Sequence, residues 1–155
     1  MKFKSFYLVA VLILLMSTKN YSQNTSSNPK ALLNHIALYV VDLKASTDFY
    51  HKIIGLDTIP EPFHDGKHTW FGIGVKSHLH LISGAKEIFE LPKNSHLCFS
   101  VASVTEFVAN LKKHHISFEN WAGEQGGITK RVDGVQQIYF KDPNGYWLEI
   151  NDAKE

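Results

Sequence analysis

An internal repeat constrains the fold of this chain more than any other feature of its sequence. Each copy contains a strand pattern, a helical pattern and two further strand patterns. The first copy places these patterns at residues 35–41, 43–54, 69–75 and 78–82, and the second at 96–101, 103–115, 135–140 and 146–150. A repeat of this length predicts two tandem βαββ modules, at 33–87 and 94–151, within one α+β domain at 32–152.

Metal-binding residue types mark equivalent points of the two copies. His35 and His96 begin the first strands, 61 residues apart, and His80 and Glu149 occupy matching positions in the last strands. Because side chains alternate along a strand, each of the four is predicted to point away from its aliphatic neighbours. We expect the aliphatic faces to pack on the helices. The His and Glu faces would then line a U-shaped mixed β-sheet cup around a metal site, with the helices on its outside.

A lone histidine on a strand is most often a core residue with one hydrogen bond, but four such side chains at equivalent repeat positions favour a metal site. Three imidazoles and one carboxylate suit one divalent ion such as Zn²⁺, Ni²⁺, Fe²⁺, Mn²⁺ or Co²⁺. The predicted ligands are His35, His80, His96 and Glu149. His78 shares the strand face of His80 and is the alternative ligand in that strand.

The two ends of the domain carry motifs that resemble a known family. The opening segment, NHIALYVVDLKASTDFYHKIIGL at 34–56, has a His-bearing strand and a helix that ends in FY and then IG. The closing segment, YFKDPNGYWLEIND at 139–152, has a DPNG turn and then a strand with Glu149. Over residues 33–151 the chain resembles the vicinal oxygen chelate superfamily. That superfamily includes glyoxalase I, extradiol dioxygenases, fosfomycin-resistance proteins and methylmalonyl-CoA epimerase.

This resemblance implies a metal-dependent lyase or isomerase of the glyoxalase type, with Glu149 as both ligand and base. The fourth ligand position, Glu or Gln in glyoxalases and the epimerase, is His80 here. Tyr139, ten residues before Glu149, resembles the acid–base tyrosine of extradiol dioxygenases; the alternative is an ordinary strand tyrosine. Family members also pair modules across a homodimer, so the resemblance leaves the site either within one chain or between two.

Aromatic and basic residues near the predicted cup are candidates for the wall of a substrate pocket. They are Trp70, Trp121, Arg131 and Trp147. Large aromatic side chains are also common in cores, and Lys130 and Arg131 lie in a glycine-rich stretch that is also typical of a solvated loop. Because Arg131 is the only arginine, few groups are present to bind glutathione carboxylates, so the chemistry of glyoxalase I can be shared without its substrate.

Three other functions compete with the lyase interpretation. An Fe(II)-dependent extradiol-type dioxygenase is favoured by Tyr139, but a fourth protein ligand at His80 would obstruct a position needed for a catechol or O₂. A transferase of the fosfomycin-resistance kind is disfavoured because its potassium-binding loop, rich in Ser and Gly, is not evident. A non-catalytic small-molecule-binding or resistance protein would not need the four metal ligands.

The N-terminus predicts export. Lys2 and Lys4 precede eleven apolar residues at 6–16, and a polar stretch completes a signal peptide at 1–23. The apolar run is shorter than the roughly 20 residues that span a bilayer, which favours cleavage over a membrane anchor. Residues 24–31 are interpreted as a polar linker. We expect a periplasmic or secreted protein with no membrane contact after cleavage.

Charge and cysteine content narrow the expected partners. Three of the 16 basic residues lie in the signal peptide, which leaves 13 basic and 15 acidic side chains. This balance does not favour a nucleic-acid partner, and a small-molecule substrate is expected instead. Cys98 is the only cysteine, so no disulfide can form within the chain, and it is predicted to be a small core residue.

Overall fold

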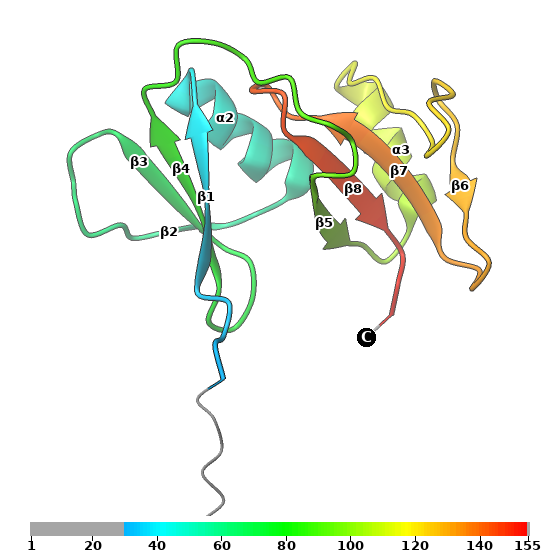
Figure 1. The fold of residues 1–155 in the computed structure, drawn as a ribbon, viewed down its shortest axis with the longest axis horizontal. Helices are drawn as coiled ribbons and strands as arrows, with labels where there is room; N and C mark the ends of the chain where they lie inside the picture. The colour runs from blue at the N-terminus through cyan, green and yellow to red at the C-terminus, as the bar shows by residue number, and fades with distance from the viewer. Residues whose placement is uncertain (1–29, 155) are drawn as a thin grey trace, which may run out of the picture. The chain divides into compact units, whose positions relative to one another are not determined.

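The structure is a computed structural model that describes residues 30–154, and the chain from Leu33 onward forms one compact unit. Two modules of the same element order follow one another along the chain (Figure 1). We call residues 33–87 the N-terminal module and residues 94–151 the C-terminal module. The predicted signal peptide and most of the predicted linker lie outside the described residues.

Each module has one strand more than its sequence pattern predicts. The N-terminal module contains β1 (His35–Val40), helix α2 (Leu43–Phe49), π-helical turn η1 (Tyr50–Ile54), β2 (Thr58–Ile59), β3 (His68–Gly72) and β4 (His78–Ser83). The C-terminal module contains β5 (His96–Ser100), helix α3 (Val104–Lys113), β6 (Thr129–Lys130), β7 (Gln136–Lys141) and β8 (Trp147–Asn151). The additional strands, β2 and β6, are two residues long, which is too short to show a hydrophobic period.

The two modules form separate four-stranded mixed sheets with the same topology. Their strand orders are β1-β4-β3-β2 and β5-β8-β7-β6. The β1–β4 and β5–β8 pairs are parallel, and the remaining pairs are antiparallel. This arrangement confirms the predicted α+β fold of two repeated modules.

The repeat extends to individual residue pairs. Ala37 is paired with His80 across β1 and β4, and Cys98 is paired with Glu149 across β5 and β8. His80 is therefore paired with the residue two positions after His35, and Glu149 is paired with the residue two positions after His96. On the other side of the last strand, Trp70 is paired with His80 and Tyr139 with Glu149. Trp70 and Tyr139 are thus equivalent positions, a relation that the sequence interpretation did not include.

Burial follows the predicted alternation in the first strand. Leu38 and Val40 are buried, whereas His35, Ala37 and Tyr39 are exposed. In β5 the same alternation leaves Cys98 exposed, so the prediction that it is a core residue is wrong. Cys98 lies on the strand face of His96, not on the face that packs toward the helices.

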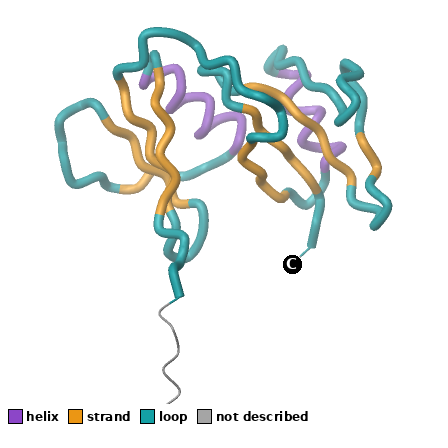
Figure 2. The backbone as a smooth tube through the Cα atoms, viewed as in Figure 1, coloured by secondary structure: helices purple, strands orange, loops and turns teal. Residues whose placement is uncertain are grey.

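Both helices begin at a side-chain cap. The Asp42 side chain accepts a hydrogen bond from the Ala45 N–H at 2.9 Å, and the Ser103 hydroxyl accepts one from the Glu106 N–H at 3.2 Å. The first helix changes to a π-helical turn at Tyr50 and ends at Gly55, whose φ of 85° suits glycine. The predicted helical segment extends to residue 115, but α3 ends at Lys113, and His115 lies beyond its end and is exposed. The connection from α3 to β6 is mostly loop (Figure 2).

One hydrophobic core joins the helices to the inner faces of both sheets. It includes Leu79 and Leu81 of β4, Leu148 and Ile150 of β8, and Leu111 of α3, all without exposed surface. The helices thus cover the aliphatic strand faces, as predicted, and leave the opposite faces to the ligand candidates.

The DPNG turn before β8 connects the modules through buried polar groups. The Asn144 side chain accepts a hydrogen bond from the Val41 N–H at 2.9 Å and donates one to the Ser46 hydroxyl at 3.0 Å. The Tyr50 hydroxyl donates to the Asp142 carboxylate at 3.1 Å. Ser46, Tyr50, Asp142 and Asn144 are almost completely buried, so the bonds among them satisfy polar atoms that have little access to water.

Gly145 closes this turn under two constraints. Its φ is 88°, in the left-handed region that favours glycine. A Cβ atom at this position would also collide with the carbonyl oxygen of Phe89, in the connection between the modules. The turn therefore requires glycine for both backbone conformation and space. Within residues 30–154, no helix has the length and apolarity needed to cross a membrane.

Candidate metal centre

The four predicted ligands lie as two pairs, one on each sheet. His35 and His80, which we call the N-terminal pair, have stacked rings with centroids 4.4 Å apart. His96 and Glu149, which we call the C-terminal pair, approach to 3.2 Å between Nε2 and Oε2. Among the described residues, no group of three or more His, Cys, Asp or Glu side chains gathers within reach of one ion. The assignment of all four to one ion therefore stays a prediction.

In the N-terminal pair, each ring has a nitrogen suited to bind a ligand. His35 Nδ1 lies 2.8 Å from the Asn34 side-chain oxygen. An oxygen of this kind can only accept, so Nδ1 carries the proton and Nε2 has the lone pair. His80 is 8% exposed, and its Nε2 is buried without a hydrogen-bond partner. A buried polar atom without a hydrogen-bond partner is costly, so this nitrogen is a candidate position for a bound ligand.

Burial is the main cause that lowers the pKa of His80, and the neighbouring His35 and His78 add to the effect. The ring is therefore neutral at neutral pH, which is the form that binds metals. The Trp70 ring stacks on the His80 ring, with centroids 3.8 Å apart and planes 7° from parallel. His78 is farther away, with its ring 6.1 Å from that of His80, and it stays the alternative ligand of β4.

The C-terminal pair repeats the same arrangement with a backbone acceptor. His96 Nδ1 lies 2.7 Å from the Lys93 carbonyl oxygen, so Nδ1 donates and Nε2 is the ring nitrogen that faces Glu149. Glu149 is 7% exposed and has hydrogen-bond donors at both oxygens. The Tyr139 hydroxyl donates to Oε2 at 2.7 Å, and the Asn151 amide donates to Oε1 at 2.9 Å.

The chemistry of this pair fits a bound cation. With Nδ1 of His96 as the donor, a neutral ring presents a lone pair to a carboxylate oxygen 3.2 Å away, and two acceptors repel at that distance. A proton on Nε2 or a metal ion resolves the conflict. Ligand atoms about 2.1 Å from one ion are about 3.0–3.4 Å apart in octahedral or tetrahedral geometry, which matches the observed separation. Orientation of a ligating His by an oxygen at its other nitrogen is also the usual arrangement in metal sites.

Hydrogen bonds keep Glu149 ionised. Burial alone would raise its pKa, but the donors Tyr139 and Asn151 outweigh this effect and hold the pKa below its usual range. Burial and the bond to Glu149 raise the pKa of Tyr139 well above its usual value, so its hydroxyl stays protonated. Although Cys98 is exposed as a residue, partial desolvation of its thiol and the charge of Glu149 raise its pKa to about 12, so the thiol stays protonated at neutral pH.

The predicted pocket residues lie around both pairs. Trp70 lines a pocket of about 510 Å³ beside the N-terminal pair. Trp121 and Arg131 line a second pocket of about 510 Å³ that Tyr139 also borders. The Arg131 guanidinium donates to the Asp133 carboxylate at 2.6 Å, so its charge is already partly compensated.

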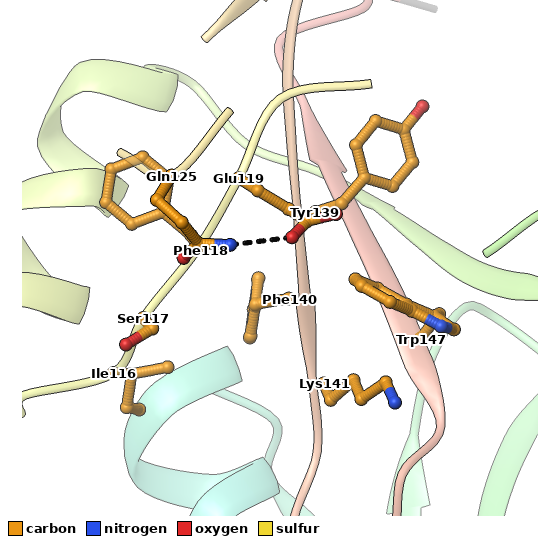
Figure 3. Close-up of a pocket in the computed structure, with 9 residues that line it drawn as sticks. All are labelled: Ile116, Ser117, Phe118, Glu119, Gln125, Tyr139, Phe140, Lys141 and Trp147. Carbon is orange, nitrogen blue, oxygen red and sulfur yellow. Dashed lines mark hydrogen bonds between the residues drawn. The ribbon is translucent and has the colours of Figure 1, made fainter. Parts of the chain in front are cut away.

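Trp147, the fourth predicted pocket residue, lines a pocket of about 530 Å³ next to Tyr139 (Figure 3). The Gln125 amide donates to Glu119 at 2.7 Å in its wall. The ammonium group of Lys93 forms an ion pair with Glu119 and lies over the rings of Tyr139 and Trp147. These contacts hold the connection between the modules against Tyr139 and Trp147.

Four supporting residues were missed in the sequence interpretation: Asn34, Lys93, Gln137 and Asn151. Asn34 and Lys93 orient the two first-strand histidines, and Gln137 donates to the Tyr139 hydroxyl at 2.7 Å. A partial signal existed, because Asn34 adjoins His35, and Gln137 and Asn151 each lie two residues from a predicted site residue. Strand alternation places such neighbours on the same face.

Comparisons with known proteins agree with this geometry. The profile of the Glyoxalase/Bleomycin resistance protein/Dioxygenase superfamily matches residues 32–150. "Glyoxylase I 4" of Arabidopsis thaliana is 29% identical over 133 residues, covering 81% of this chain and 74% of that protein. The lactoylglutathione lyase of Pseudomonas aeruginosa is 23% identical over 155 residues, with coverage of 79% and 82%.

Solved structures show the same fold. A glyoxalase/dioxygenase from Nostoc punctiforme superimposes with a TM-score of 0.65 at 23% identity, covering 83% of this chain and all of that chain. "Oxidase ChaP-H2" superimposes with a TM-score of 0.61 at 22% identity, covering 81% and 96%. At these identities the likeness concerns the fold alone.

Proposed function

Because this chain belongs to the Glyoxalase/Bleomycin resistance protein/Dioxygenase superfamily, we propose that it is a divalent-metal-dependent lyase or isomerase of the glyoxalase type. Its substrate would be a small oxygenated compound. The observation that carries the proposal is the C-terminal pair, where His96 Nε2 and Glu149 Oε2 lie 3.2 Å apart and each group is oriented by a hydrogen bond to another residue. The buried, unpartnered Nε2 of His80 supports it from the other sheet.

The N-terminal pair needs one change to bind a single ion. The lone pair of a ring nitrogen lies in the ring plane, so two ligating rings must both direct their planes at the ion. The rings of His35 and His80 are 7° from parallel with centroids 4.4 Å apart, so their planes do not meet nearby. His80 is buried against Trp70 and His35 is exposed, so the ring that turns is that of His35, which would pivot about its Nδ1 bond to the Asn34 side chain and keep that bond.

We propose that a second copy of the chain completes the site. Each pair supplies only two ligands, whereas a borderline divalent ion takes at least four. A symmetric dimer in which the N-terminal pair of one copy meets the C-terminal pair of the other would provide four ligands at two identical sites. The site is then shared between chains, and each copy contributes to both sites.

When bound, a divalent ion would polarise the substrate oxygens and stabilise negative charge that develops on them. Glu149 would take a proton from the carbon next to those oxygens, because hydrogen bonds keep its carboxylate ionised. Tyr139 would orient this carboxylate through its hydroxyl, whose direction is fixed because Gln137 donates to the same oxygen. The burial of Glu149 would exclude water from the transfer.

One observation favours a second candidate, an Fe(II)-dependent extradiol-type dioxygenase. The Tyr139 hydroxyl lies 2.7 Å from a carboxylate oxygen of the C-terminal pair, a suitable place for an acid–base group. Turnover of methylglyoxal hemithioacetals made with several thiols would support the lyase. Oxygen consumption with catechols on the Fe²⁺-loaded protein would support the dioxygenase. If the protein holds stoichiometric metal but shows neither activity, a non-catalytic binding role is the remaining interpretation.

Complementation between two inactive variants tests the shared site. One variant carries His35→Ala and His80→Ala, and the other carries His96→Ala and Glu149→Gln. In a shared site, a heterodimer of the two has one intact set of ligands, so a refolded equal mixture should regain about a quarter of the wild-type metal content. Sites within single chains would regain none. If the wild type holds no stoichiometric Ni²⁺, Zn²⁺, Fe²⁺, Mn²⁺ or Co²⁺, the metal-dependent proposal falls.

We also propose that the protein works outside the cytoplasm. The support is the signal-peptide pattern at residues 1–23, which lies outside the described residues. Cell fractionation with mass spectrometry of the mature N-terminus tests this proposal. A full-length chain retained in the cytoplasm would contradict it.

A further inference from the structure

The side chain of Lys93 is enclosed, although it belongs to the connection between the modules. It is 18% exposed, and its ammonium forms an ion pair with the Glu119 carboxylate. The ammonium also donates to the carbonyl oxygens of Asn120 and Trp121, at 3.3 and 3.2 Å. Each of its three N–H groups therefore has an acceptor on one of three consecutive residues.

Two aromatic rings complete the surroundings of this ammonium. Its nitrogen lies 5.7 Å from the centre of the Tyr139 ring and 5.3 Å from that of the Trp147 ring, within the range of a cation–π interaction. Three oxygens and two ring faces are surroundings suited to a bound cation, and here the chain supplies that cation itself. Because the group is mostly shielded from water, its electrostatic contacts are screened less than those of a surface lysine.

The segment that the ammonium contacts is paired with Tyr139. The Glu119 N–H donates to the Tyr139 carbonyl and the Tyr139 N–H donates to the Glu119 carbonyl, both at 2.8 Å. The Tyr139 hydroxyl in turn donates to Glu149 at 2.7 Å. Trp121, in the same segment, lines a pocket together with Tyr139. The position of residues 119–121 therefore affects where the Tyr139 hydroxyl and the Trp121 ring lie.

Lys141 provides a comparison, because its ammonium lies over the same Trp147 ring, 5.2 Å from the ring centre. Its side chain is 36% exposed, and its carboxylate partner, Glu90 at 3.6 Å, is 90% exposed. Exposed pairs of this kind contribute little to stability. Lys141 is thus a matched control for a lysine on this ring without the acceptors that surround Lys93.

We propose that Lys93 is a positioning residue. Its ammonium acts as a built-in cation that holds residues 119–121 against β7 and thereby keeps the Tyr139 hydroxyl directed at Glu149. The importance of Tyr139 for a metal site rests on the proposed function. The ordering of the segment does not, because every contact involved lies within the polypeptide.

Amide hydrogen exchange of the metal-free protein measures the order of this segment. Lys93→Met keeps the length of the side chain but removes the charge, so amides of residues 119–127 should exchange at least about tenfold faster. Amides of the N-terminal sheet should be unchanged, and Lys141→Met should leave residues 119–127 as in the wild type. Wild-type protection in Lys93→Met would overturn the proposal. Equal losses in the two variants, or faster exchange throughout Lys93→Met, would overturn a local role.

Chemical rescue tests whether the charge itself is responsible. Lys93→Ala removes the outer part of the side chain, which n-propylammonium matches in length and charge. Because the Lys93 side chain is partly exposed, a small amine can enter from solvent. We expect n-propylamine at neutral pH to restore most of the lost protection with a saturable dependence on concentration, and 1-propanol to restore none. Equal effects of the two compounds, or no effect of the amine, would overturn the assignment to the ammonium.

The Cζ atom of Tyr139 reports on the connection to Glu149. In protein labelled with ¹³C at the tyrosine Cζ atoms, Tyr139→Phe assigns the signal and Lys93→Met should shift it. In Lys93→Ala, n-propylamine should return the signal toward its wild-type position, a response that a simple packing defect would not show. An unchanged Tyr139 signal alongside faster exchange would overturn the positioning role. Metal analysis is a separate measurement, so success in these tests with a protein that binds no metal would refute only the proposed function.

Discussion

Trp70 and Tyr139 occupy the same register position in the two modules, but only Tyr139 donates a hydrogen bond to the neighbouring ligand candidate. Trp70 lies flat on His80 and offers its nitrogen no hydrogen bond, so Nε2 of His80 stays buried and unpartnered. Tyr139 donates to Glu149, which has donors at both oxygens. A repeated backbone thus fixes where functional side chains lie, whereas their immediate neighbours decide whether a group is held rigidly or left available.

The turns before the last strands should show the largest difference between the modules. Asn144→Ala removes the acceptor of the Val41 N–H and the amide that donates to Ser46 and Asp142 in a buried turn, and we expect a loss of about 3 kcal/mol in the free energy of unfolding. Val75→Ser changes a fully exposed residue in the turn before β4 and should alter stability by about 0.5 kcal/mol or less. Urea unfolding measures both. Similar losses would contradict the unequal roles of the two turns.

Substitution at the equivalent positions should show a smaller but clear asymmetry. Tyr139→Phe removes a donor to a buried carboxylate and leaves the Gln137 amide unpaired, so we expect a loss of about 2 kcal/mol. Trp70→Phe removes an N–H that already lacks a partner while a stacked ring remains, so the loss should stay below about 1 kcal/mol. Unfolding of the metal-free variants compares the two. A larger loss for Trp70→Phe would reverse the comparison.

The two first-strand histidines are oriented by different kinds of acceptor, and this difference can be tested through metal affinity. Asn34→Ala removes the side-chain oxygen that fixes the His35 ring, so we expect metal to bind roughly 10-fold to 100-fold more weakly. Lys93→Ala keeps the backbone carbonyl that orients His96 and should weaken metal less. Competition with a chromophoric chelator gives the affinities. An unchanged affinity in Asn34→Ala would show that this contact does not support the site.

The smallest expected effect is a difference in the acid stability of the two pairs. The pKa of His80 is lowered in the fold, so the unfolded chain binds protons more readily and stability is lost as pH falls below about 6.5. The pKa of Glu149 is also lowered, so its contribution is lost only as pH falls below about 4.5. His80→Phe should flatten the stability profile of the metal-free protein in the first range and Glu149→Gln in the second. If both variants altered the stability profile in the same pH range, the result would contradict separate environments for His80 and Glu149.

Sequence patterns predicted the parts of this molecule that depend on periodicity. Alternation correctly separated His35 from Leu38 and Val40, and the repeat placed His80 and Glu149 at equivalent register positions. The strand β2 was missed because two residues carry no period. Cys98 was wrongly placed in the core because a cysteine in an apolar strand is most often buried, although alternation puts it on the strand face of His96.

The supporting contacts could not be predicted, because they depend on tertiary packing. The bond from His96 to the Lys93 carbonyl depends on the conformation of the connection between modules, which leaves no pattern in side-chain types. The bond between Tyr50 and Asp142 joins residues 92 positions apart. In the proposed dimer, whether the two pairs meet at one ion depends on the contact between two copies, which local sequence patterns do not reveal.

Gly145 has a consequence for how variation in this protein should be interpreted. In a library of random substitutions this position should accept almost nothing, although its residue has no side chain to contribute chemistry. The intolerance originates in the carbonyl of Phe89, 56 residues earlier, and in a backbone angle. A mutational scan scored by activity alone would therefore rank Gly145 beside Glu149, and only a parallel measurement of protein abundance would separate the residue that shapes the turn from the residue that acts.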